Sequence, residues 1–210
     1  MDIEGNVNTY LGERMPTGRY SSFDYCFNHF QGHRGRAVDL SSPEGVELSC
    51  LHLGFYLASW GMLRASSPLL RRSIKHYAPL IEAIAASPDE VWEIDVHGYS
   101  ADAIQLLLET ATRLRTALPD RASDTLITKI MLGVFGGVPA FDTFFRRGFG
   151  VSSLGSKSLY RIRDFYESNA EAIDRHLVPT LDFAKGQPTE LCYTRAKVID
   201  MIFFIAGYEA

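Results

Sequence analysis

The sequence has few cysteines, and none of them are paired at the spacing of a metal-binding or redox motif. Among its 210 residues only Cys26, Cys50 and Cys192 are cysteines, and no two of them form a Cys-x-x-Cys pattern. An odd, widely spaced set is typical of a reducing compartment and argues against zinc or an iron–sulfur cluster. The histidines show no metal-ligand spacing either. We therefore expect no metal and no other cofactor.

The chain also lacks an apolar run that approaches the roughly 20 residues of a membrane span. Its first ten residues, MDIEGNVNTY, are polar and acidic and do not resemble a secretory signal. The formal net charge is −4, so there is no chain-wide positive field, and any contact with nucleic acid would have to come from a local patch. We expect a cytoplasmic protein that does not enter a membrane.

Hydrophobic residues are plentiful, at 46% of the chain, which is enough for a substantial core and too many for a disordered chain. A length of 210 residues suits one large domain or two small, closely packed ones. Alternating strand patterns are scarce, and the best of them, residues 91–96, could equally be a short extended connector. The sequence therefore predicts an all-α fold with about seven or eight helices.

Helical periodicity is the dominant pattern along the chain. It is clearest over residues 100–119, where apolar residues fall on one face and Ser100 is the expected N-cap. Further helices are predicted over residues 21–32, 41–64, 66–86, 123–135, 140–150, 156–176 and 193–207. Residues 1–19 are expected to be an irregular lead-in and residues 33–45 a turn-rich linker, while Pro79 is expected to kink or split its helix.

The most distinctive segment is GGVPAFDTFFRRGFG, residues 136–150. Its single carboxylate, Asp142, follows an apolar approach and precedes Arg146 and Arg147 by one helical turn. A carboxylate fixed in an apolar site stabilises developing positive charge more strongly than water does. The competing interpretation is that Asp142 only caps a helix that begins at Thr143, because Asp is a preferred N-cap residue. The two roles are compatible, since a capping carboxylate is held rigidly.

This segment resembles a signature of the helix-hairpin-helix DNA glycosylase superfamily, in which an apolar helix leads to Val-Pro-x-Asp-Thr-x-x-x-Arg. Here the order runs from Val138 to Arg147, with one extra residue between Pro139 and Asp142. The resemblance is specific only over about residues 120–150. The family's Gly-x-Gly hairpin is missing, because the chain has LPDRASDTLITK in its place, and this removes the usual backbone grip on phosphate.

The resemblance implies a fold and a reaction. The fold would be a single two-lobed helical domain over residues 1–210, with an N-terminal segment (1–40) that carries a short aromatic helix and a helical body (41–210). The reaction would be hydrolysis of an N-glycosidic bond by a monofunctional DNA glycosylase. Asp142 would stabilise the oxocarbenium-like charge on the sugar and would orient or deprotonate water.

Lys129 stands where bifunctional members of the superfamily often place a nucleophilic lysine, although its interval to Asp142 is shorter than theirs. Such a role needs a desolvated pocket, and the alternative is a solvated charge on an amphipathic helix. Compact, diverged members resemble bacterial antiviral glycosylases that excise modified cytosines from phage DNA. The expected partner is therefore DNA, including modified phage DNA, and the expected state is a monomer.

Two further groups of residues are candidates for contacts with DNA. Aromatic and polar side chains that would hold an extruded base are Tyr20, Phe23, Asp24, Tyr25, Asn28 and Trp60. Asp24 and Asn28, one helical turn apart, would read a Watson–Crick edge, whereas Phe23 fits the core better than a base pocket. Candidates for phosphate contacts are Arg64, Ser66, Ser67, Arg146 and Arg147, with plain surface charge as the alternative for each arginine.

Two other functions stay open. Arg71 and His76 have the Arg-x4-His spacing of HEPN-type ribonucleases, which are also small helical proteins, although so short a pattern arises easily by chance. The third possibility is a non-catalytic nucleic-acid-binding module on a degenerate glycosylase scaffold.

Overall fold

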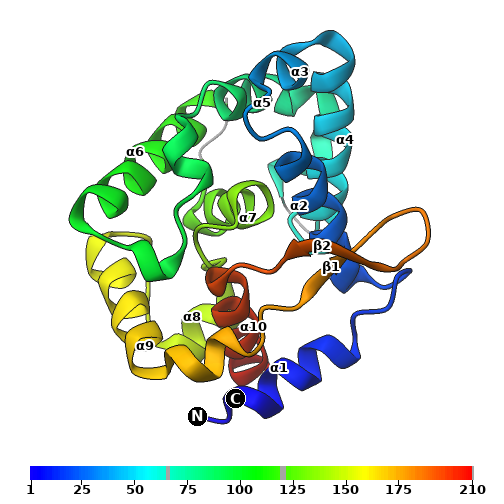
Figure 1. Cartoon of the computed structure of the whole chain (residues 1–210). Coiled ribbons are helices and arrows are strands. Elements are labelled where there is room, and N and C mark those ends of the chain that lie inside the picture. Colours follow the sequence, from blue (N-terminus) through cyan, green and yellow to red (C-terminus); the bar gives the residue numbers. More distant parts are fainter. Residues whose placement is uncertain (65–66, 119–121, 210) are drawn as a thin grey trace.

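The computed structural model describes residues 1–64, 67–118 and 122–209, and this part of the chain is mostly helical (Figure 1). Its α-helices are α1 (Ile3–Gly12), α2 (Ser22–Gly32), α3 (Ala37–Ser41), α4 (Pro43–Ser59), α5 (Ala78–Ala85), α6 (Ala101–Ala117), α7 (Asp124–Phe135), α8 (Thr143–Phe149), α9 (Ser156–Asp174) and α10 (Arg195–Glu209). The all-α prediction is therefore confirmed at the level of fold class.

Short elements connect the helices. Turns of 310-helix occupy Arg19–Ser21, Pro68–Arg71, Ile74–Tyr77, Asp89–Trp92 and Val96–Gly98. One antiparallel hairpin, made of β1 (Pro179–Leu181) and β2 (Pro188–Cys192), precedes α10. The hairpin lies against α2, from which it is separated by more than a hundred residues of chain (Figure 1).

Two helices form the centre of the molecule because their sequences are apolar on nearly every side. Helix α7 contacts α2, α4 and α6, and Figure 1 shows it surrounded by the other helices. Helix α10 contacts α1, α8 and α9. Helices that are hydrophobic all round are buried in the core, so these two segments set the positions of the others.

Several expectations for the less apolar segments are wrong. Residues 1–19 are not an irregular lead-in, because Asp2 caps α1 by accepting a hydrogen bond from Gly5 N (2.9 Å). Residues 33–45 contain the short helix α3 and the start of α4. Residues 91–96 are not a strand but include a short connector, residues 93–95, between two 310 turns, which is the alternative that the sequence allowed. The split expected at Pro79 is confirmed, because two 310 turns precede α5 and Pro79 lies in its first turn.

The crossing of α8 and α10 is unusually close, since each helix presents a glycine to the other. A Cβ atom added to Gly207 would overlap the carbonyl oxygen of Phe144, and one added to Gly148 would overlap the carbonyl oxygen of Phe203. Because Asp142 is the N-cap of α8, this contact also places the helix end that carries Asp142.

We expect Gly207→Ala to destabilise the fold by about 1–3 kcal/mol, because the added methyl group pushes α8 away from α10. The matched control is Gly32→Ala at the end of α2, where an added Cβ has no neighbour within 4 Å. Urea unfolding of both variants measures the difference. Equal stability of the two variants would show that the α8–α10 crossing tolerates a side chain.

Candidate functional site

A polar pocket of about 130 Å³ lies where α4 ends and α7 and α8 begin. Four of the residues singled out in the sequence line it together, namely Asp142, Lys129, Trp60 and Arg64. The pocket is completed by residues that the sequence did not indicate, among them Arg19. The structure therefore gathers part of the predicted site from segments that are far apart along the chain.

Asp142 and Lys129 form a largely buried ion pair in this pocket. Lys129 Nζ donates to Asp142 Oδ2 at 3.0 Å, and the two side chains are only 5% and 14% exposed. The other carboxylate oxygen, Oδ1, accepts a hydrogen bond from Phe145 N (2.9 Å), so Asp142 is the N-cap of α8 as the capping interpretation predicts. The alternative for Lys129, a solvated charge on a helix face, is wrong because the lysine is buried.

The loop that leads to Asp142 is held from two sides. Phe141 N donates to Thr128 Oγ1 (2.8 Å) on α7, and the carbonyl oxygen of Phe141 accepts from Thr125 Oγ1 (2.9 Å). Ala140 N donates to Asp200 Oδ1 (3.0 Å) on α10. The Asp142 carboxylate is therefore fixed both by its capping hydrogen bond and by the hydrogen-bonded loop before it. A carboxylate fixed in this way needs little reorganisation when charge develops beside it.

Trp60 lies among several cations at the pocket. Its ring centroid is 5.3 Å from Lys129 Nζ, 5.4 Å from the guanidinium carbon of Arg19 and 5.6 Å from Lys197 Nζ. Each distance is within the range of a cation–π attraction. Tyr20 packs edge-on against the indole, with ring centroids 5.3 Å apart. Tyr20 therefore supports Trp60, whose indole lines the pocket together with the aromatic residues Phe144 and Phe204.

A second ion pair, which the sequence analysis missed, lies deeper in the protein. Lys197 Nζ donates to Asp200 Oδ2 (3.0 Å) and to the hydroxyl of Tyr10 (2.8 Å). Burial lowers the pKa of Lys197, while the Asp200 carboxylate opposes that shift. Asp200 also accepts from Ala140 N, so this pair ties α1 and α10 to the loop before Asp142. The available signal was two charges three residues apart in an otherwise apolar helix.

Asp24 and Asn28 do recognise a polar edge, but it belongs to a strand of this chain. Asp24 Oδ2 accepts from Leu181 N (3.1 Å), and Asn28 Nδ2 donates to Leu181 O (2.8 Å). Asp24 is fully buried, and this burial raises its pKa despite a hydrogen bond from Tyr193. Both side chains fix β1 on α2, so they lie outside the pocket of Asp142.

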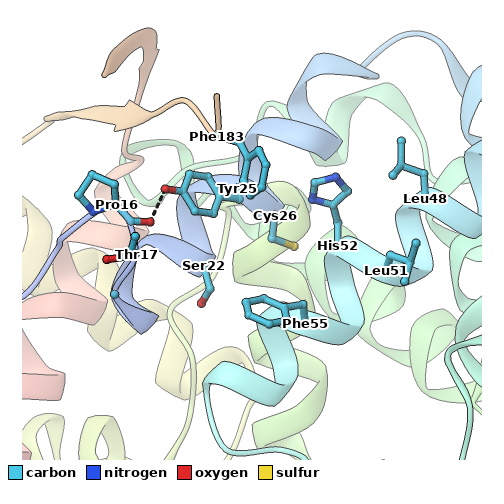
Figure 2. Close-up of a pocket in the computed structure, with 11 residues that line it drawn as sticks. Pro16, Thr17, Ser22, Tyr25, Cys26, Leu48, Leu51, His52, Phe55 and Phe183 are labelled. Carbon is cyan, nitrogen blue, oxygen red and sulfur yellow. Dashed lines mark hydrogen bonds between the residues drawn. The ribbon is translucent and has the colours of Figure 1, made fainter. Parts of the chain in front are cut away.

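Tyr25 lines a different cavity, an apolar groove of about 410 Å³ between α2 and α4 (Figure 2). Its hydroxyl donates to Pro16 O (2.6 Å), and Phe55 and Phe183, 70% and 81% exposed, lie in the same groove. His52, another lining residue, stacks on His29 at 4.3 Å between ring centroids. Tyr25 is therefore separated from the pocket of Asp142, as is Phe23, which is fully buried in the core.

The other predicted phosphate contacts are used within the fold or lie outside its described part. Arg146 Nη1 donates to Ser152 O (3.3 Å) and Arg147 Nη1 to Gly207 O (3.2 Å), and neither arginine lines the pocket. Ser67 Oγ donates to Met62 O (2.7 Å). Ser66 falls outside the described residues.

The arrangement around Arg71 and His76 gives no support to a HEPN-type site. The two residues lie in separate 310 turns, Pro68–Arg71 and Ile74–Tyr77, with extended backbone at Arg72 between them. They therefore do not share the face of one helix.

Comparisons of the chain with protein-family models, with curated proteins and with solved structures found no match. The resemblance to helix-hairpin-helix glycosylases gains no support from them and rests on the segment around Asp142. Across residues 1–64, 67–118 and 122–209, no helix has the length and apolar content needed to cross a membrane. The same residues contain no group of three His, Cys, Asp or Glu side chains that would hold a metal ion.

We expect Lys197→Met to lower the free energy of unfolding by about 3–5 kcal/mol, because Asp200 is left as an uncompensated buried charge. Adding Asp200→Asn should recover part of this loss, since the amide oxygen still accepts from Ala140 N while the charge is gone. Arg163→Met is the control, because it breaks an exposed ion pair on α9 and should cost less than about 1 kcal/mol. Denaturant unfolding gives all three values. A double variant less stable than Lys197→Met would contradict this interpretation of the pair.

Proposed function

We propose that the protein is a monofunctional DNA glycosylase in which Asp142 acts on the sugar of a nucleotide extruded from DNA. The observation that carries the proposal is the placement of Asp142. Its carboxylate is fixed by Phe145 N and Lys129 in a pocket that also presents Trp60. Both the resemblance of the surrounding segment and the geometry of the pocket support this reaction.

The chemistry requires a carboxylate that stays in place. As the glycosidic bond breaks, positive charge develops on the sugar in an oxocarbenium-like transition state. A fixed carboxylate in a partly buried site stabilises that charge and can orient or deprotonate the attacking water. Each oxygen of Asp142 is engaged by one donor, and a carboxylate has about four lone-pair sites in all. Lone pairs therefore remain for the sugar or for water.

Lys129 acts as a positioning residue in this mechanism. Its ammonium group lies 3.0 Å from Asp142 Oδ2 and fixes the rotation of the carboxylate. Attack by Lys129 on the sugar would require this ion pair to break first and its ammonium to lose a proton. Water is therefore the nucleophile in the proposed reaction, and the product is an abasic site without a covalent link to the protein.

Trp60 provides the surface on which the extruded base stacks, as is common in proteins that take a base out of the helix. The pocket is small, with a volume of about 130 Å³. A bulky modification on the base would have to extend out of the pocket. The proposed substrates include the modified cytosines of phage DNA. Excision of these bases would give the protein an antiviral role.

Asp142→Asn should reduce base release by about a thousandfold or more, because the amide still caps α8 but carries no charge. Lys129→Met is the comparison variant, since it breaks the same ion pair but keeps the carboxylate. It should reduce base release because the carboxylate loses the group that positions it, but much less than Asp142→Asn does. The measurement is mass spectrometry of bases freed from unmodified DNA and from phage DNA with modified cytosines, and RNA is included as a substrate.

Two results would contradict the proposal. One is base release by Asp142→Asn at the parental rate. The other is a protein–DNA adduct that is trapped by borohydride in the parent and lost in Lys129→Met, which would make Lys129 the nucleophile. Cleavage of RNA that depends on Arg71 and His76 would assign the protein to the HEPN alternative.

A further inference from the structure

Arg19 and Arg64 differ from most of the described arginines in the contacts of their guanidinium groups, which pack against rings or backbone. Neither guanidinium group has a hydrogen bond or an ion pair with any residue that the structure describes. Arg115 and Arg195, by contrast, are paired with the carboxylates of Asp124 and Asp174. A guanidinium group is always charged and has five N–H donors. Two such groups without acceptors at one place are suited to an external anion.

Both arginines line the pocket of Asp142, and their neighbours orient them there. The guanidinium carbon of Arg19 lies 5.2 Å from the ring centroid of Tyr20 and 5.4 Å from that of Trp60. Arg64 lies across Gly61, where an added Cβ would be 3.3 Å from the guanidinium carbon. Gly61 has a φ of +76°, which other residues rarely adopt. The backbone at Gly61 therefore makes room for Arg64.

The local charge balance is positive although the whole chain is negative. The charged residues that line the pocket are Arg19, Arg64, Lys129 and Asp142. Lys129 is balanced by Asp142 at 3.0 Å, which leaves the charges of the two arginines unbalanced in a protein of net charge −4. Guanidinium groups match phosphate oxygens in geometry as well as in charge, because each can donate two parallel hydrogen bonds.

We propose that Arg19 and Arg64 form a phosphate-binding subsite for the nucleotide whose sugar lies at Asp142. The inference rests on the proposed function for the position of the sugar, but phosphate binding itself needs no reaction. The Asp142 carboxylate repels a phosphate, so the anion lies on the arginine side of the pocket. This arrangement also supplies a grip on phosphate that the missing Gly-x-Gly hairpin does not provide.

The proposed ligand is a phosphate group attached to a nucleoside, and two kinds of molecule contain such a group. One is the phosphodiester of DNA and the other is the terminal phosphate of a free nucleotide. Calorimetric titration with four probes separates them: inorganic phosphate, thymidine, thymidine 5′-monophosphate and a short single-stranded oligonucleotide without terminal phosphates. Tighter binding of the oligonucleotide than of the monophosphate identifies DNA as the source, and the reverse identifies a free nucleotide.

Arg19→Gln and Arg64→Gln should each weaken binding of the tightest phosphate-containing probe by about tenfold or more, because each removes charge-assisted hydrogen bonds. Arg19→Lys should have an intermediate effect, since it keeps the charge and loses the planar fork. Arg175→Gln, at the exposed end of α9 outside the pocket, is the control and should bind as the parent does. Asp142→Asn should tighten binding severalfold by removing the repulsion.

The inference is overturned if the parent binds none of the phosphate-containing probes, or if the two Gln variants bind them as the parent does. Melting curves of each variant establish that the fold is kept. If Arg19→Gln is unfolded, the weaker binding expected of Arg19→Lys tests the role of Arg19 instead. Base release that is independent of both arginines would contradict this inference and leave the proposed function standing. Phosphate binding without base release from any DNA would support this inference and contradict the proposed function.

Discussion

The contact between Lys129 and Asp142 is the constraint on which the site depends. A carboxylate that is mostly withdrawn from water needs donors, and here one donor comes from α7 and the other from the first turn of α8. Because α7 is the central helix of the fold, the position of Lys129 is set by the core. The ion pair therefore holds the one carboxylate in the pocket at a position that is set by the core.

The second ion pair, Lys197–Asp200, constrains the backbone of the loop before Asp142. Asp200 holds the peptide of Ala140 with one oxygen and Lys197 with the other. Buried ion pairs often contribute little net stability because both charges lose their hydration, but a buried charge without its partner is strongly destabilising. Through Asp200, the pair anchors the backbone of the loop before Asp142 to α10 at Ala140.

The strongly periodic helices were predictable from the sequence. The expected helix over 100–119 corresponds to α6, and that over 123–135 to α7, because each has an apolar face or an apolar circumference and a clear serine cap. The capping role of Asp142 was predictable for the same local reason. Helix α1 was not, since only Val7 and Tyr10 of its ten residues are buried and no apolar stripe marks it.

Contacts between distant segments could not be read from local patterns. The spacing of Asp24 and Asn28, one helical turn apart, suits the edge of a base, whereas the edge that they bind is the backbone of Leu181. Arg19 was overlooked because its segment was expected to be irregular. It joins the pocket only through the packing of the Arg19–Ser21 turn against Trp60. Lys129 and Asp142 were both identified, but their direct contact required the loop geometry.

The most direct test of this account is a crystal structure of the Asp142→Asn variant bound to a DNA duplex. The duplex carries, still attached to its sugar, the base that the parent protein releases. The account predicts an extruded nucleotide with its base on Trp60 and its C1′ atom within about 3.5 Å of the side chain at position 142, as a near-attack geometry requires. A nucleotide seated instead in the groove lined by Tyr25 and Phe183, out of contact with position 142, would contradict it.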